Sequence, residues 1–589
     1  MPAALPPSAT KIRLALLTLS LLSGCAAAAP GQSSPGQSSP GKAGPTAPFT
    51  AAGDAGAYLV GRAAGRAGDL DLATDSFLHV LHDQPGNAEL RQQAFLAALL
   101  AQRPEALDLA AQQDSNPLAQ LLLAGAEVRA GRWSAAETRF AALPRQGMTE
   151  ILQPLLVAWA QQGSGRTDAA LATLKPFAEK DRFRPIYLMH SALIADLGSR
   201  DPQAARLYEA TAAEFSTLNL EVARVLASWK ARHGDMEGAQ AELHALVAAI
   251  PDLTLALPGL QAHIADRPVS SAAQGIASAY VAMASALRAQ DAGDYAALLL
   301  RLALDLEPDM AGARLISAEL DEAGHRTGAA LETLRAVPPD DPLAPLADLR
   351  RASLLDRTGR TAEALAVLDA LEKAQPDRPE PWALRGAILR GQHRYAEAAL
   401  AYGEAIARTT PPQRMDWSLF YERGIALERA GKWPDAEADF RQALKLYPDQ
   451  PSVLNYLGYS WTEQGSHLAE ARQMIERAAA LRPNDGAVLD SLGWVMLRQG
   501  DVAGAVRSLE RAVELEPEDP TINGHLGDAY KAAGRQMEAV FQWHRALTLN
   551  PEADERERIA ARLREVGESV PAPAATQQAG GGPAASRQN

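Results

Sequence analysis

Few residues of this 589-residue chain have types and spacings that suit catalysis or metal binding. The first candidates are two histidines. His79 and His82 are three positions apart, which on a helix puts two possible zinc ligands on one face. A zinc site needs three or four protein ligands, and no third one stands nearby in the sequence. We interpret the pair as solvated or core side chains, so the sequence predicts no metal site.

Two glycine-containing segments invite comparison with phosphate loops and nucleophile elbows. Gly61, Gly65 and Gly68 have the spacing of a loose phosphate loop, but no strand precedes them. Gly163-Ser164-Gly165 falls where a turn between two helices is expected, not a strand-to-helix elbow. Among 71 acidic residues some pairs must lie close together, so their number does not indicate acid/base catalysis. The sequence therefore predicts neither an enzyme nor a bound cofactor.

The clearest chemical signal is the single cysteine of the chain, Cys25, which excludes an intramolecular disulfide. A short basic stretch precedes the apolar run from Leu14 to Leu22, and the small residues Ser23-Gly24 stand directly before the cysteine. A run of nine apolar residues is too short to cross a bilayer, which needs about 20 residues of helix. We expect residues 1–24 to be a signal peptide that is removed before Cys25.

Leu22-Ser23-Gly24-Cys25 resembles the lipobox of bacterial lipoproteins. The resemblance implies that the Cys25 thiol carries a diacylglycerol group and that its new amino terminus is acylated. Several acyl chains would anchor the protein durably, since each buried methylene contributes about 0.8 kcal/mol. In enterobacterial lipoproteins an aspartate after the cysteine favours the inner membrane, and here that residue is Ala26. The expected location is the outer membrane, facing the periplasm.

Both ends of the chain are expected to be flexible, because they are rich in Ala, Pro, Gly and Ser and cannot form a core. Residues 25–56 include a direct duplication, Gly31–Pro35 and Gly36–Pro40. A flexible tether of about 30 residues has a root-mean-square length of roughly 30 Å. Residues 570–589 are expected to be a disordered tail that follows a capping helix at 552–569.

Between these ends the composition favours packed helices and argues against a nucleic-acid partner. Hydrophobic residues make up 47% of the chain and aromatic residues only 5%, with alanine and leucine prominent. The formal net charge of −14 would repel a phosphate backbone.

Small residues and prolines recur at one period of 34 or 35 residues in the C-terminal half. The positions are Gly424, Gly458, Gly493 and Gly527, and Pro448, Pro483, Pro517 and Pro551. With alanines later in each unit, this pattern resembles the tetratricopeptide repeat. The resemblance implies an all-α, right-handed superhelical solenoid of about 13 helix-turn-helix repeats. We expect a divergent array at 57–250, a proline-interrupted junction at 251–276 and a second array at 277–551.

In this repeat family the second, fifth, ninth and twelfth positions of each first helix face a concave ligand groove. The residues at these positions that we select as a candidate peptide-binding groove are Tyr421, Asn455, Tyr459, Asp490, Trp494 and Asp528. Aromatic residues supply much of the energy of interfaces, although Tyr459 and Trp494 could equally pack against the next repeat. The carboxylate clamp of chaperone-binding repeats is absent, and the acidic residues favour cationic or apolar extended ligands.

The run from Asn455 to Tyr459, with Leu489–Trp494 and His525–Asp528, also resembles a group of long tetratricopeptide lipoproteins of Gram-negative bacteria. One type is an outer-membrane adaptor that presents cell-wall hydrolases to a periplasmic carboxyl-terminal processing protease. The resemblance implies a lipid-tethered scaffold with protein or peptide partners. Two alternatives stay open: a scaffold for assembly or export of polysaccharide or pili, and a hydrolase of envelope polymers.

Overall fold

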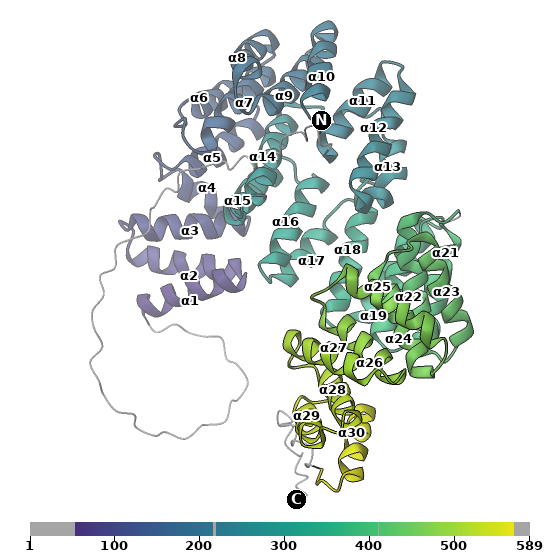
Figure 1. Ribbon diagram of the computed structural model, residues 1–589. Coiled ribbons are helices and arrows are strands. Elements are labelled where there is room, and N and C mark those ends of the chain that lie inside the picture. Colours follow the sequence, from purple (N-terminus) through teal and green to yellow (C-terminus); the bar gives the residue numbers. More distant parts are fainter. Residues whose placement is uncertain (1–52, 216–218, 410, 571–589) are drawn as a thin grey trace, which may run out of the picture. The chain divides into compact units, whose positions relative to one another are not determined.

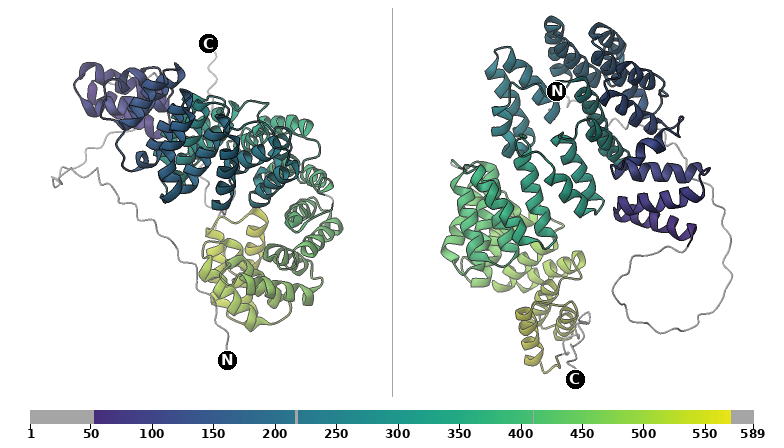
Figure 2. Two further views of the ribbon diagram at one scale, coloured as in Figure 1. Left: turned by 90° about the horizontal axis from the view of Figure 1, so that it is seen from above. Right: turned by 180° about the vertical axis from the view of Figure 1, so that it is seen from behind.

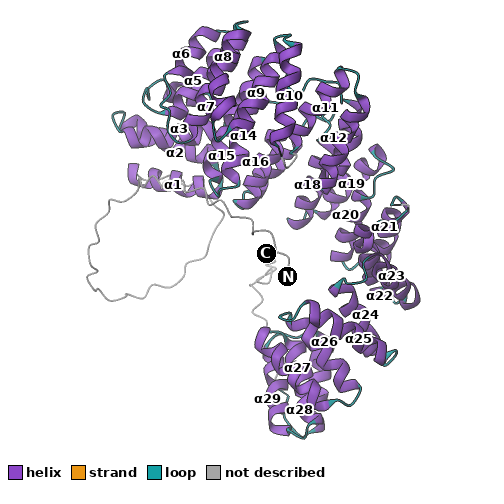
Figure 3. Ribbon diagram, turned by 45° about the horizontal axis from the view of Figure 1, so that its top comes forward, coloured by secondary structure: helices purple, strands orange, loops and turns teal. Residues whose placement is uncertain are grey.

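The computed structural model describes residues 53–215, 219–409 and 411–570, and every regular element in these ranges is a helix (Figures 1 and 3). The predicted all-α solenoid of helix-turn-helix units is confirmed. The bounds are α1 Asp54–Ala67, α2 Leu70–Asp83, α3 Ala88–Leu100, α4 Glu105–Ala110, α5 Pro117–Arg129, α6 Trp133–Ala141, α7 Met148–Gly163, α8 Thr167–Lys180, α9 Arg184–Leu197, α10 Asp201–Glu214, α11 Leu220–Arg232, α12 Met236–Ala249, η1 Pro251–Ala256, α13 Leu257–Ala262, α14 Ala272–Arg288, α15 Gly293–Leu306, α16 Ala311–Ala323, α17 Thr327–Arg335, α18 Ala344–Arg357, α19 Thr361–Ala374, α20 Glu380–Gly391, α21 Tyr395–Ala407, η2 Arg414–Asp416, α22 Trp417–Arg429, α23 Trp433–Leu446, α24 Pro451–Gln464, α25 Leu468–Leu481, α26 Gly486–Arg498, α27 Val502–Leu515, α28 Pro520–Ala532, α29 Gln536–Thr548 and α30 Ala553–Glu565.

Some expected boundaries shift in the structure, and some fall outside its described part. The array begins at Asp54, and the junction expected at 251–276 is largely helical, with η1, α13 and the start of α14. The expected signal peptide at 1–24 and the expected lipid attachment at Cys25 lie outside the described residues, as do most of the expected tether and C-terminal tail.

Local chemistry explains where the helices begin and end. At the start of α28 the side chain of Asp519 accepts hydrogen bonds from the backbone N–H groups of Thr521 and Ile522, at 2.8 and 2.9 Å. Between the two helices of a C-terminal unit stands a glycine with positive φ, as at Gly500 (83°) and Gly534 (77°). This conformation is costly for any residue with a Cβ atom, which explains why glycine ends these turns.

The periodic glycines inside the first helices are steric requirements. A Cβ atom built on Gly527 would lie 2.5 Å from the indole of Trp543, and one on Gly493 would lie 2.5 Å from Leu509. The partner helix therefore occupies the space that a side chain would need. The same stacking of close helix pairs is visible from two further directions (Figure 2).

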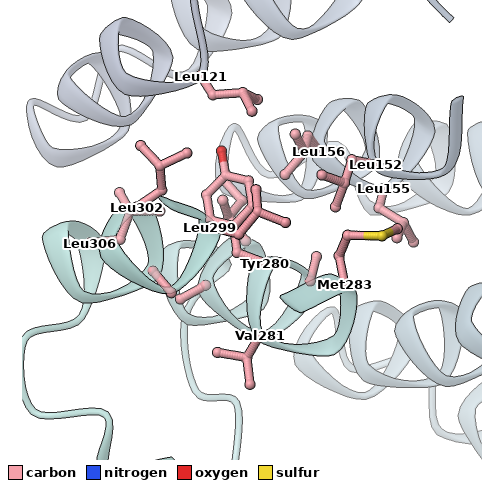
Figure 4. Close-up of a cluster of buried hydrophobic side chains, with 14 of the residues drawn as sticks. Leu121, Leu152, Leu155, Leu156, Tyr280, Val281, Met283, Leu299, Leu302 and Leu306 are labelled. Carbon is pink, nitrogen blue, oxygen red and sulfur yellow. The ribbon is translucent and has the colours of Figure 1, made fainter. Parts of the chain in front are cut away.

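Helices α14 and α15 depart from simple stacking, because they lie against the first helices of much earlier repeats. Helix α14 packs on α7 and α9, and α15 packs on α3 and α5. The close-up in Figure 4 places Tyr280 and Met283 of α14, and Leu299, Leu302 and Leu306 of α15, among Leu121 of α5 and Leu152, Leu155 and Leu156 of α7. All of these residues belong to one buried cluster that runs from Ala64 to Ala313.

Steric and polar contacts hold the α14–α15 hairpin in this place. A Cβ atom on Gly275 of α14 would lie 2.3 Å from Trp159 of α7, so the helix backbone rests directly on the indole. On α5, Arg129 forms an ion pair with Asp305 of α15 and donates to its backbone carbonyl at 3.2 Å. The Ser278 hydroxyl of α14 donates to a carboxylate of α11.

The leucines of α15 are almost completely buried. Six of its leucines are at most 7% exposed: Leu298, Leu299, Leu300, Leu302, Leu304 and Leu306. At about 1.5–3 kcal/mol for each buried side chain, their burial contributes on the order of 10 kcal/mol. Part of this burial is against α14 and part is against α3 and α5, so it ties the hairpin to the N-terminal half.

Helices before and after the α14–α15 hairpin form a second hydrophobic core. Helices η1 and α13 pack with α12, and η1 also contacts α18. Residues between Ala223 and Ile388 share this core, although the α14–α15 hairpin is left out of it. The segment after α13 is fastened by Arg267, which donates to the buried carboxylate of Asp196 at 3.1 Å.

Asp196 is the centre of a buried polar network that joins α9, α10, α11 and the junction. It is 4% exposed and accepts from Tyr208 at 3.1 Å and from Arg232 at 3.0 Å, in addition to Arg267. Three donors compensate the cost of burying this charge.

Replacing Asp196 with Asn should therefore strongly destabilise the N-terminal half, by about 3–5 kcal/mol, because two arginines lose their common acceptor. The midpoint of urea unfolding, followed by circular dichroism, measures the effect. Asp168→Asn is the matched control, because Asp168 pairs with Arg200 on the surface and has a side chain 79% exposed. Equal midpoints for the two variants would contradict this assignment.

Candidate protein-binding groove

Helices α22, α24, α26 and α28 carry the six groove residues that the sequence selects, and the structure divides these residues into two groups. Asp490 and Trp494 are buried, at 5% and 6% exposure. Tyr421, Asn455, Tyr459 and Asp528 are half-buried. The six do not form one uniform open surface.

The first group belongs to a compact cluster between α26 and α28, around a histidine that the sequence analysis did not select. The Trp494 indole stacks on the His525 imidazole, with ring centroids 4.1 Å apart and planes 15° apart. His525 Nδ1 lies 2.9 Å from one carboxylate oxygen of Asp490. Trp494 Nε1 also donates to Glu463 of α24 at 2.6 Å. Trp494 therefore packs between repeats.

The electrostatics of this cluster favour a cationic His525. Burial by itself lowers the pKa of the imidazole, but the adjacent Asp490 carboxylate, with a contribution from Asp528, outweighs burial and raises that pKa above its ordinary value. Asp490 thus faces a positive partner inside the protein.

Asp528 is also paired within the chain. Its carboxylate accepts from Arg562 Nε of α30 at 3.0 Å and from Trp543 Nε1 at 3.2 Å. The expectation that acidic groove residues select cationic ligands therefore needs correction, because Asp490 and Asp528 are both neutralised by internal partners. The position in the repeat predicted where these side chains lie, but it did not predict their hydrogen-bond partners within the chain.

Tyr421 packs inside an aromatic cluster and presents only part of its ring to the groove. Its ring centroid lies 5.8 Å from that of Tyr456 in an edge-to-face arrangement, and 6.0 Å from that of Phe440. Burial, followed by the charge of Glu422, raises the pKa of Tyr421 to about 12. Trp461, expected in the core, is fully buried.

Asn455 and Tyr459 are the two neighbouring residues of α24 that keep unused binding capacity. Among the described residues, the Oδ1 atom of Asn455 has no hydrogen-bond donor although it is buried. The Tyr459 ring lies 6.5 Å from that of His525, and burial raises the pKa of its hydroxyl. Together they offer an amide and an aromatic ring on one helix face.

Seven of the concave positions in α5, α7 and α9 are apolar and buried. The residues are Leu121 and Val128 of α5, Leu152, Leu155 and Trp159 of α7, and Met189 and Leu193 of α9, none more than 4% exposed. These three helices contact the α14–α15 hairpin, and Figure 4 shows Leu121, Leu152 and Leu155 beside it. The sequence analysis did not predict that these positions are covered. Large apolar residues at positions that normally face solvent could have indicated it.

The remaining chemical candidates lie apart from the groove. His79 and His82 are exposed on α2. Within residues 53–215, 219–409 and 411–570, no cluster of three or more His, Cys, Asp or Glu side chains is placed to hold a metal ion. In the same ranges no helix has the length and apolar character that crossing a membrane requires.

Comparison with known families assigns the repeats directly. Residues 421–486 and 491–554 match the family described as tetratricopeptide repeat, and residues 259–417 match the tetratricopeptide repeat-like domain. The matched regions include five of the six candidate groove residues, and Asp490 falls between the two matched ranges.

Two bacterial relatives are similar over about a third of the chain. The TPR repeat-containing protein PA4667 of Pseudomonas aeruginosa is 32% identical over 189 residues, which are 32% of this chain and 31% of that protein. Cellulose synthase operon protein C of Xanthomonas axonopodis pv. citri is 28% identical over 230 residues, 34% of this chain and 15% of that protein. The alignments thus span less than a third of either relative.

Solved structures share the helical repeat at low similarity. The APC/C hetero-tetramer Cut9-Hcn1 covers 86% of this chain and 96% of its own at 13% identity, with a TM-score of 0.36. Yeast Tom70 covers 87% and 95% at 14% identity, with a TM-score of 0.32. Such scores support no conclusion about partners.

His525→Gln should lower the unfolding midpoint most near pH 6 and less as pH rises. Because the folded pKa of His525 is raised, its contribution to stability is complete below about pH 6.5 and is lost as pH rises through the folded value. Near pH 6 the variant leaves Asp490 buried without its cation, which costs about 3–5 kcal/mol. Urea unfolding at pH 6 and pH 9 measures the difference.

The double variant Asp490→Asn with His525→Gln is the control, since it removes both charges and should recover part of the loss. A His525→Gln effect that is equal at pH 6 and pH 9 would show that the pair is not charged.

Proposed function

We propose that this tetratricopeptide-repeat protein is a lipid-tethered scaffold of the cell envelope, which holds a protease and its envelope substrates close to each other. At the coarser level the protein is a protein-binding repeat scaffold. The membrane anchor, the periplasmic location and the protease partner are the proposal.

The proposal rests on a difference between the two halves of the array. Concave positions of the N-terminal repeats are covered by the α14–α15 hairpin, whereas some in the C-terminal repeats are partly accessible. Helix pairs in such arrays mainly contact their neighbours, which leaves long continuous surfaces for partners. In the C-terminal repeats, Asn455 and Tyr459 remain partly accessible at these positions. The partly accessible ring of Tyr459 suits recognition of a polypeptide segment.

The sequence before the array supports a tether. A lipidated Cys25 and a leash of roughly 30 Å would keep the scaffold near one membrane, where captured proteins meet at raised effective concentration. The resemblance to protease adaptors over the C-terminal repeats supports the choice of partner.

A second function has one observation in its favour. Cellulose synthase operon protein C is, by its name, connected with cellulose synthesis, and it matches 34% of this chain. This similarity favours a scaffold for polysaccharide assembly as the alternative, and the identity of captured partners separates the two.

Replacing Cys25 with Ala should move the protein from the membrane fraction to the soluble fraction, because the residue that would carry the acyl chains is lost. Fractionation of cells followed by immunoblotting measures the distribution. Ala28→Ser, three residues further along the tether, is the matched control and should remain with the membrane. A Cys25→Ala protein that stays in the membrane fraction would contradict the anchor.

Replacing Tyr459 with Ala should lower partner capture about tenfold or more, as expected for an aromatic interface residue worth at least 1.4 kcal/mol. Crosslinked pulldown from envelope extract with quantitative mass spectrometry provides the measurement. Phe541→Ala is the matched control, since Phe541 is an aromatic residue 65% exposed on the second helix of a repeat, α29.

The proposal requires that a protease and an envelope protein are both captured by the unchanged chain. Capture of polysaccharide-assembly proteins instead would favour the alternative function. Equal capture by Tyr459→Ala and Phe541→Ala would exclude Tyr459 from the binding surface.

A further inference from the structure

The concave side of the N-terminal repeats has an occupant that belongs to the chain itself. The contacts of α14 and α15 with the N-terminal array involve α3, α5, α7 and α9, which are the first helices of their repeats. First helices line the groove in which arrays of this kind take ligands. The hairpin therefore occupies the place of a bound helical ligand.

The side chains at this interface are those of a permanent core. Trp159, at a ninth position, is fully buried beneath the backbone of α14 at Gly275. Leu121 and Leu155, at fifth positions, are also fully buried. The Arg129–Asp305 ion pair closes the edge at α15.

Beyond the hairpin, the ninth position varies in character, and it is apolar at Ile425 of α22 and Trp494 of α26. It is Glu319 in α16, where the carboxylate pairs with Arg288 and Arg350, and Ser353 in α18. It is Asp528 in α28. The ninth positions beyond the hairpin are thus mixed, whereas those of α7 and α9 are the buried apolar residues Trp159 and Leu193.

We propose that the α14–α15 hairpin is a built-in ligand of the N-terminal groove, and that clients contact the scaffold only through the concave positions of α18 to α28. The proposal rests on the scaffold function proposed above and specifies which repeats select the partner. The groove of the N-terminal half therefore binds no client protein.

An external ligand cannot easily displace this occupant. It would have to replace the buried leucines of α15 and the packing of Gly275 on Trp159 with equivalent contacts. The hairpin is also held covalently at both ends, and Arg267 fastens the segment that leads into α14 through the buried Asp196. Its effective concentration at the groove therefore exceeds that of any free competitor.

The test loosens the hairpin without touching the C-terminal repeats. Gly275→Ala places a Cβ atom against Trp159, whereas the matched control Gly312→Ala adds one in α16 with no atom within 4 Å. Hydrogen–deuterium exchange of the full-length protein, followed by mass spectrometry, reports opening of α7, α14 and α15. Crosslinked pulldown from envelope extract reports client capture.

We expect Gly275→Ala to accelerate exchange in α7, α14 and α15 at least tenfold, while Gly312→Ala does not. Client capture should be unchanged in both, and addition of envelope extract should leave the exchange of the hairpin unaltered. If Gly275→Ala does not fold, Met283→Ala loosens the same interface by leaving a cavity, since Met283 is 5% exposed.

Increased capture by a loosened variant, or faster exchange of α14 upon addition of extract, would overturn the proposal by showing that clients compete for this groove. Unchanged exchange in both loosened variants would overturn the occupancy itself. If the unchanged protein captures no partner, the scaffold function fails, and the exchange data still decide whether the hairpin is a stable occupant.

Discussion

Close approach of paired helices at small residues is the constraint on which the rest of the structure depends. Where Gly493 or Gly527 stands in a first helix, a side chain of the second helix fills the space that a Cβ atom would need. Repetition of this contact stacks hairpins with their first helices on one side. Residues at the second, fifth, ninth and twelfth positions then converge on a common surface, and their polarity decides whether that surface is buried or accessible.

The two halves of the chain differ in what these converging residues contact. In α5, α7 and α9 most of the converging residues are apolar, and the α14–α15 hairpin covers them. In the last repeats Asp490, Trp494 and His525 satisfy one another across neighbouring first helices. Burial of the charged pair is tolerable because each charge has a partner within hydrogen-bond distance. On α24, Asn455 and Tyr459 remain half-buried and are not part of this charged pair.

The helical repeat could be predicted because its signals are local and periodic. Gly458 and Pro483 belong to patterns that recur every 34 or 35 residues, and each reports a turn or a close contact within its own hairpin. The groove was predicted less well. Asp528 was selected at a correct repeat position, but its partners are Trp543 in the next helix and Arg562 in α30, 34 residues away. The repeat position showed where Asp528 lies, but the sequence did not show which residues of its own and the following unit would pair with it.

The sequence by itself determined the class of the fold, the period of its units and the turns that separate them, because these depend on contacts between residues that are close along the chain. Only the tertiary structure decided which concave positions remain accessible. Arg129 and Asp305 are 176 residues apart, yet they form an ion pair. Such contacts form because the path of the backbone through the junction brings α14 and α15 against the earlier repeats. The filled groove is therefore a property of the folded molecule.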